Sequence, residues 1–212
     1  MNRKSVALVA LCLTSLVLTT SVNRAAGEAL ARIAPGRLGW IADACIPSCL
    51  AGALIYVMAR PGRPFGRPAP GTPRARIYRI GAVWLAIWLL GSAAVAVARG
   101  RWIAYTHGAA SIAGFVVIAP IGEELLFRGA IYEIAERALP GRARAPLLVA
   151  STFFALHHLQ LHGFRLDGPA LAQVSFAFPM GIVFGRLRGL SQSIWPGLAL
   201  HVLTNLPGAF GA

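Results

Sequence analysis

The stretch Ile118 to Arg128 reads IAPIGEELLFR and sets two adjacent carboxylates, Glu123 and Glu124, at the end of a strongly apolar segment. Acidic residues are scarce, since only 7 of the 212 residues are Asp or Glu. A carboxylate at the edge of a hydrocarbon layer is costly unless it is paired or serves a function. The Glu pair is therefore the first candidate for a functional site.

The composition around this stretch is that of an integral membrane protein. Hydrophobic residues make up 57% of the chain and charged residues 13%, with a mean hydropathy of +0.65, whereas a soluble domain carries roughly 25% charge. The net charge of +13 does not predict nucleic-acid binding, because the arginines cluster between apolar runs, as topology signals do. The cysteines predict packed or lipid-facing thiols rather than a disulfide framework, since all lie within apolar runs: Cys12, Cys45 and Cys49.

Apolar runs of suitable length predict an all-α bundle of about seven transmembrane helices. We expect them at residues 5–21, 38–58, 80–98, 105–121, 145–161, 169–185 and 191–210. The first run also fits a signal-peptide core, but its length and the poor cleavage site after it favour a retained helix. The chain then divides into an N-terminal three-helix region, residues 1–100, with an Arg- and Pro-rich loop at 60–79, and a C-terminal set of helices, residues 101–212.

The distribution of basic residues predicts how these helices cross the membrane. With a cytoplasmic N-terminus, the cytoplasmic side holds the tail, the loops at 60–79 and 137–144 and a turn at 186–188, which together carry 13 basic residues. Only six basic residues fall on the other side. The positive-inside rule therefore favours a cytoplasmic N-terminus.

Helical geometry divides the Glu pair. Glu124 and Arg128 lie four residues apart, so they share one helix face and can pair. Glu123 points about 100° away from that face. Taken alone, the segment is also consistent with an ion pair at the membrane edge. We expect a more polar helix to continue it over residues 127–138, until Leu-Pro-Gly at 139–141 stops it.

Two later spans carry polar residues at the same interval. Phe154 precedes His158 by one turn, and His201 precedes Asn205 by one turn. Separately, a membrane histidine can bond to a backbone carbonyl and an asparagine can join packed helices. A single polar centre shared with Glu123 explains all of them more economically. A carboxylate that takes a proton from water, imidazoles that orient the water or bind a metal, and a carboxamide that donates to an oxyanion are the parts of an amide hydrolase.

Signatures of other intramembrane proteases are missing from the sequence. It contains no His-Glu-x-x-His for a zinc-dependent site-2 type, no Gly-x-Gly-Asp for a presenilin type and no Gly-x-Ser-Gly for a rhomboid type. The run Leu166-Asp167-Gly168 is similar to the second motif of the site-2 type. Without the first motif, we interpret Asp167 as the N-cap of the next helix.

Together, the motifs resemble those of the CAAX-processing and bacteriocin-processing (CPBP, or Abi) intramembrane endopeptidases, which are related to type II CAAX prenyl endopeptidase. The family pattern is Glu-Glu-x-x-x-Arg, then Phe-x-x-x-His, then His-x-x-x-Asn or Asp. The residues that meet it are Glu123, Glu124 and Arg128, then Phe154 and His158, then His201 and Asn205. The resemblance covers roughly residues 104–207.

The resemblance implies an all-helical membrane bundle with a water-activating glutamate at its centre. Carried over residue by residue, the roles are Glu123 as base, His158 and His201 as water holders, Asn205 as oxyanion donor, and Glu124 with Arg128 as a supporting pair. Phe153 and His157 also satisfy the second motif. We favour His158 because the run Phe-Ala-Leu-x-His-Leu is the family's usual one, with Phe154 and His157 in supporting positions.

The cofactor and the substrate stay open at this level. The family is discussed both as metalloproteases and as metal-free glutamate proteases. Glu123, His158 and His201 could hold a divalent metal such as zinc, but asparagine is a poor zinc ligand, so we favour a centre without a cofactor.

The resemblance implies a multi-pass protein of the bacterial cytoplasmic membrane that cleaves a membrane-anchored protein or peptide precursor, with no requirement for prenylation. The alternative function is a non-catalytic binding or immunity protein whose polar residues line an intramembrane ligand site.

Overall fold

The computed structural model describes residues 70–100 and 113–209, together with eight isolated positions before residue 70. Within these residues every regular element is a helix and none is a strand, which confirms the all-α class for this part of the chain. The helices expected at 5–21 and 38–58, and the three cysteines, lie outside the described residues. The count of seven spans therefore stays a prediction.

Helix α3 (Arg74–Arg99) is the third expected span, and it begins earlier than the sequence indicated. The loop expected to last until residue 79 ends at Pro73, because proline is tolerated before the first helical turn and the exposed Arg side chains there do not interrupt backbone pairing. The helix ends at Gly100, whose φ of 66° is the left-handed conformation that glycine adopts at low cost.

The surface of α3 requires an apolar surrounding. Its most apolar stretch of 18 residues has a mean hydropathy of 2.1, yet only 6% of that stretch is buried within the protein. A second helix, α8 (Gly168–Ser191), is also long and apolar enough to cross a membrane. Exposing the apolar side chains of α3 to water would be strongly unfavourable, so this helix fits a bilayer.

The Glu pair lies in the middle of one continuous helix that changes type along its length. Its segments follow without a break as η1 (Gly114–Ile118), α5 (Ala119–Glu123), η2 (Glu124–Ile131) and α6 (Tyr132–Ala138). Both η1 and η2 are π-helical, the type in which an N–H bonds to the carbonyl five residues back instead of four, as the Ala119 N–H does to Gly114 and the Tyr132 N–H to Phe127. The expectation that residues 127–138 continue the same helix is confirmed.

The remaining helices are α7 (Ala145–His157), α8 and α9 (Trp195–Asn205), with two 3₁₀ segments, η3 (His158–His162) and η4 (Leu206–Ala209). The fifth expected span, residues 145–161, changes from α7 to η3 between the adjacent histidines. The expected N-cap is confirmed, since the Asp167 side chain accepts from the Ala170 N–H at 2.9 Å.

One expected turn is wrong. Residues 186–188 do not form a turn between spans but lie inside α8, which continues to Ser191. The reason is that Arg188 is buried and ion-paired with Glu133 at 3.0 Å, so its charge does not force the chain into water. The turn falls instead at residues 192–194, and the last helix starts at Trp195.

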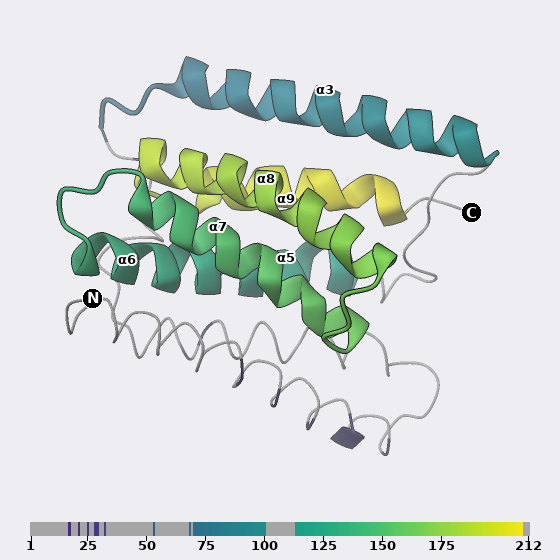
Figure 1. The fold of residues 1–212 in the computed structure, drawn as a ribbon. Helices are drawn as coiled ribbons and strands as arrows, with labels where there is room; N and C mark the ends of the chain where they lie inside the picture. Colours follow the sequence, from purple (N-terminus) through teal and green to yellow (C-terminus); the bar gives the residue numbers. More distant parts are fainter. Residues whose placement is uncertain are drawn as a thin grey trace.

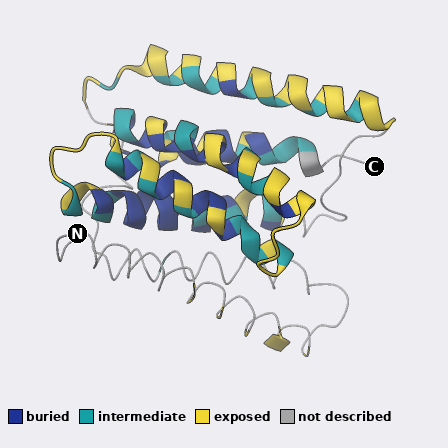
Figure 2. Cartoon of the chain, in the orientation of Figure 1, coloured by how far each residue is buried: buried dark blue, intermediate teal, exposed yellow. Residues whose placement is uncertain are grey.

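The helices stack in layers, with α3 lying over α8 and α9, and with α7 and the 113–138 helix on the other side of α8 (Figure 1). Burial is concentrated on the 113–138 helix, α7 and α8, whereas α3 is largely exposed (Figure 2). Helix α8 approaches α7 closely through Gly181, where an added Cβ would lie 3.0 Å from the Ser151 Cα.

Candidate active site

The structure brings His201 between the two carboxylates of the first motif. The His201 Nε2 lies 3.4 Å from Glu123 Oε2, and its Nδ1 lies 3.2 Å from Glu124 Oε1. The imidazole is 2% exposed and the Glu124 side chain is fully buried, whereas the Glu123 side chain keeps 16% exposure. Glu123 is thus the carboxylate of this pair that an incoming molecule can reach.

Glu124 is paired with Arg128, as their spacing indicated. Arg128 Nη1 lies 3.0 Å from Glu124 Oε1, and both side chains are fully buried. The guanidinium also lies over the ring of Phe154, 4.2 Å from its centroid, and donates to the Gly181 carbonyl at 3.4 Å. A buried charge without such partners would be strongly destabilising, so Arg128 and Glu124 stabilise each other inside the bundle.

The two carboxylates have different effects on His201. Glu124 can only accept at Nδ1 when it is ionised, so that nitrogen carries the hydrogen and the ring is held in one orientation. The other nitrogen, Nε2, then faces Glu123, and a proton can be shared between them. This contact of Glu124 with His201 was not expected from the sequence, which assigned Glu124 to Arg128 alone.

Phe154 joins the two candidate histidines. Its buried ring has His158 at its edge, with centroids 4.9 Å apart, and His201 at 5.8 Å. The His158 Nδ1 lies 2.8 Å from the Phe154 carbonyl, which can only accept, so Nδ1 carries the hydrogen. In the neutral ring, Nε2 of His158 is therefore the nitrogen that can accept a hydrogen bond.

The two adjacent histidines differ in their surroundings. His158 interacts electrostatically with Glu123, His201 and Arg128. His157 lies 2.7 Å from the Gln160 side chain and packs against Phe127 with ring centroids 5.3 Å apart. This arrangement favours His158 as the histidine of the site and His157 as a packing residue.

Asn205 has a partner that the sequence did not indicate. Its Nδ2 donates to the Phe115 carbonyl at 3.0 Å, not to the Glu123 and His201 side chains. An amide nitrogen carries two hydrogens, so one of them stays available for another acceptor. Helix α9 is fixed next to this point by α3, because the Trp88 indole donates to the Thr204 carbonyl at 2.7 Å.

Residues 104–207 match the family model described as type II CAAX prenyl endopeptidase Rce1-like. This part of the chain, just under half of its length, is similar to the Rce1-like family. The match spans all of the motif residues, from Glu123 to Asn205. No curated protein and no solved structure matched the chain. The Rce1-like family is a protease family, which supports a peptidase, and the apolar helices of the chain are consistent with transmembrane segments.

Two residues of the Rce1-like segment were missed by reasoning from the sequence. At Gly197, in the first turn of α9, an added Cβ would lie 3.0 Å from Glu124 Oε2, so a larger residue would push α9 away from the buried carboxylate. Arg188 was assigned to a turn, yet its Nε donates to the Arg128 carbonyl at 3.2 Å. In the sequence, Gly197 two residues after Trp195 is only a weak signal of close helix packing. Nothing in the sequence around Arg188 indicates that its side chain is buried.

The three residues considered as metal ligands do not form a ready ligand set. Across the described part of the chain, no three His, Cys, Asp or Glu side chains lie together as a metal ion would require. In addition, both ring nitrogens of His201 face carboxylates, and Nδ1 of His158 faces a carbonyl. We therefore describe the chemistry of the Rce1-like site through its own side chains.

Proposed function

We propose that this protein is an intramembrane endopeptidase that hydrolyses a peptide bond in a membrane-associated protein or peptide, with Glu123 as general base. The observation that carries the proposal is the position of the His201 ring between Glu123 and Glu124, among buried apolar side chains. A carboxylate beside a fixed imidazole can move a proton to and from water. A purely structural ion pair would need Glu124 and Arg128 but not the second carboxylate.

Hydrolysis follows from the atoms at the site. Glu123 takes a proton from a water molecule that is held by the Nε2 of His158, and the water oxygen bonds to the carbonyl carbon of the scissile peptide. The carbonyl becomes an oxyanion, and the second N–H of the Asn205 side chain donates to it. The C–N bond then breaks as the proton on Glu123 passes to the leaving nitrogen, which gives one new carboxyl group and one new amine.

His201 and Glu124 assist without bonding to the substrate. Because Glu124 holds the Nδ1–H of His201, the Nε2 of that ring stays directed at Glu123 and can share its proton through the cycle. The Arg128 guanidinium balances the charge of Glu124 inside the bundle. Removal of this support would change both the orientation of His201 and the stability of the helix.

The test is the variant Glu123→Gln in proteoliposomes that contain a tagged, membrane-anchored peptide. We expect cleavage to fall by at least about 100-fold, because glutamine cannot take the proton, while the melting temperature stays near that of the wild type. The matched control is Glu136→Gln, an exposed glutamate on the same continuous helix. Full cleavage by the Glu123→Gln variant would exclude this role.

The same experiment separates the alternative of a non-catalytic binding protein. Such a protein would retain the peptide without new termini in both the wild type and the Glu123→Gln variant. The substrate itself is best identified by comparing terminal peptides of membrane proteins from cells with wild-type protein and cells with the Glu123→Gln variant.

The absence of a cofactor is a prediction with its own measurement. We expect activity to persist after strong chelation and metal analysis to find no stoichiometric metal in the purified protein. Stoichiometric zinc that is lost together with activity, and restored with it, would contradict this prediction.

A further inference from the structure

At the end of each π-helical segment of the 113–138 helix, one N–H bonds to the carbonyl five residues back and so does not bond to the carbonyl four residues back. At the end of η1, the Ala119 N–H bonds to the Gly114 carbonyl and so does not bond to the Phe115 carbonyl. The residue after Ala119 is Pro120, which has no N–H to donate. At the end of η2, the Tyr132 N–H bonds to Phe127, so the carbonyl passed over on return to α-helical pairing is that of Arg128.

Both of these carbonyls accept a hydrogen bond from a side chain of another helix. The Phe115 carbonyl accepts from Asn205 of α9 at 3.0 Å, and the Arg128 carbonyl accepts from the Nε of Arg188 of α8 at 3.2 Å. A buried carbonyl without a donor costs about 1–3 kcal/mol, so each side chain stabilises the π-helical form next to it. The two π segments flank α5, whose last residue is Glu123.

Arg188 divides its hydrogen bonds among the backbone, a carboxylate and the Gln192 side chain, whose Oε1 accepts from Nη1 at 3.4 Å. Its Nε is used by the Arg128 carbonyl, and its Nη2 donates to Glu133 Oε2 at 3.0 Å. The side chain is 3% exposed, and its guanidinium lies 5.4 Å from the Tyr132 ring centroid. Arg186, two residues earlier on the same helix, is exposed. A buried arginine that donates to a main-chain carbonyl holds the backbone of the neighbouring helix in place, in addition to pairing its own charge with a carboxylate.

Helix α8 thus holds Arg128 at two points. The Gly181 carbonyl accepts from the Arg128 guanidinium at 3.4 Å, and Arg188, two turns further along the same helix, donates to the Arg128 main chain at 3.2 Å. Arg128 in turn holds Glu124, whose carboxylate holds His201. A shift of the Arg128 backbone would therefore be transmitted to both candidate catalytic groups, Glu123 and His201.

We propose that Arg188 is a positioning residue that keeps the Glu-Glu segment in its π-helical register through the Arg128 carbonyl. This inference rests on the proposed endopeptidase function. In this proposal, the Nε contact with the Arg128 carbonyl holds the backbone next to the catalytic groups in place. The Nη2 contact with Glu133 compensates the buried charge of Arg188. The two contacts can be separated, because lysine offers one ammonium in place of the two-sided guanidinium.

The experiment compares Arg188→Lys and Glu133→Gln with the matched control Arg186→Gln in the proteoliposome assay. Lysine keeps the charge for Glu133 but cannot also reach the Arg128 carbonyl, so we expect kcat to fall about 10- to 100-fold with KM within about twofold of the wild type. Glu133→Gln keeps the Nε contact, so we expect its kcat to stay near that of the wild type, as for Arg186→Gln.

Amide hydrogen exchange supplies a readout that does not depend on activity. Exchange over residues 124–132 should rise several-fold in Arg188→Lys and stay unchanged in Glu133→Gln and Arg186→Gln. Equal losses of kcat in Arg188→Lys and Glu133→Gln would overturn the proposal, because the ion pair would then be the essential contact. Unchanged kcat and exchange in Arg188→Lys would overturn it as well.

Two further outcomes are informative. If Arg188→Lys does not purify as a single species, Glu133→Gln carries the test: preserved kcat and exchange support the proposal, and a tenfold loss of kcat overturns it. If the wild type shows no cleavage, the endopeptidase function fails, while the exchange measurement still decides whether Arg188 holds the π segment.

Discussion

Adjacent residues in a helix face different partners, and Glu123 and Glu124 show how far this separation can extend. Glu124 is fully buried and bonds to Arg128 and His201, whereas Glu123 is partly exposed and contacts the other nitrogen of the same imidazole. The first arrangement supports the site, and the second leaves a carboxylate oxygen able to meet water. The two residues should therefore respond differently to the same substitution.

At the residue scale, we predict that Glu124→Gln lowers stability and activity together. The substitution leaves the buried Arg128 guanidinium without its countercharge, and breaking such a pair costs on the order of 3 kcal/mol or more. We expect a melting temperature several degrees lower in detergent and loss of peptide cleavage. Glu123→Gln should lose cleavage alone. If Glu124→Gln melts like the wild type, the pair does not stabilise the bundle.

The sequence was informative about which residue types meet, and less so about how they are joined. The interval of four residues predicted the pair of Glu124 with Arg128 and the packing of Phe154 against His158, and both are present. It did not predict that Asn205 would bond to a backbone carbonyl, because a freed carbonyl depends on helix type rather than on side-chain spacing.

At the scale of elements, helix type and helix packing determine where the site lies. Runs of apolar residues predicted where α7 and α8 begin, since the spans expected from residues 145 and 169 start at Ala145 and Gly168, but they did not predict where these helices end. They did not predict the π segments, since a change from four-residue to five-residue pairing alters the apolar pattern too little to be seen over eight residues. They also misassigned Arg188, because a buried charge is identified by its partner and not by its neighbours in sequence.

Close packing of α8 on α7 leads to a prediction that compares two glycines. An added Cβ at Gly181 would lie 3.0 Å from the Cα of Ser151, which is main chain and cannot rotate away. At Gly185 the nearest atom, at 2.6 Å, is the terminal Cδ1 of Leu147, which can change rotamer. We expect Gly181→Ala to lower stability by about 1–3 kcal/mol and Gly185→Ala by less, despite the shorter distance.

The measurement for these two variants is the melting temperature of each purified protein in the same detergent. Gly91→Ala is the control, because nothing lies within 4 Å of its added Cβ and alanine favours a helix. Gly181 also supplies the carbonyl that Arg128 uses, so its variant should lose activity more than Gly185→Ala does. A loss of stability in Gly185→Ala equal to or greater than that in Gly181→Ala would show that the Leu147 side chain does not move away from the added methyl group.

At the scale of the whole molecule, charge is distributed unequally between the two ends of the bundle. Helix α3 runs parallel to α9, since Trp84 and Trp88 both donate to Thr204 and an added Cβ at Gly81 would meet Leu200. The start of α3 therefore lies at the end where α6 and α8 finish (Figure 1). That end carries the exposed arginines Arg74, Arg76, Arg79, Arg137, Arg142, Arg144 and Arg186.

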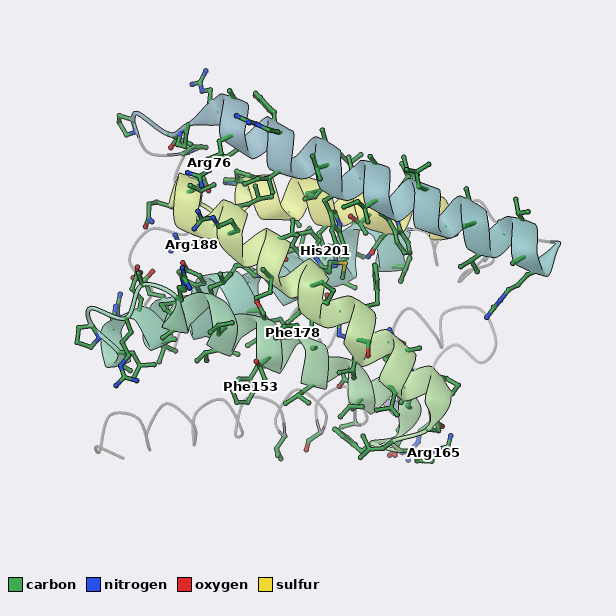
Figure 3. The ribbon with its side chains drawn as sticks, turned by 45° about the horizontal axis from the view of Figure 1, so that its top comes forward. Arg76, Phe153, Arg165, Phe178, Arg188 and His201 are labelled. Carbon is green, nitrogen blue, oxygen red and sulfur yellow. The ribbon has the colours of Figure 1, made fainter. Side chains whose placement is uncertain are left out.

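The opposite end carries fewer charges, and the candidate site lies between the two. Figure 3 shows Arg76 and Arg188 toward one end, Arg165 at the other and His201 between them. Among the residues that the structure describes, the exposed arginines of the second end are Arg99 and Arg165.

This asymmetry predicts the orientation of the protein in the membrane. Basic residues are retained on the cytoplasmic side, so the end that holds Arg142 should be cytoplasmic and the end that holds Arg165 should face outward. We propose Arg142→Cys and Arg165→Cys, made separately in a background whose three native cysteines are replaced by serine. A membrane-impermeant maleimide should label Arg165→Cys in intact cells and Arg142→Cys only after permeabilisation. Both positions are exposed, so accessibility within the fold does not favour either one. The reverse pattern would place the N-terminal side outside and would require the arginine-rich end to be explained by a bound anionic partner instead of by topology.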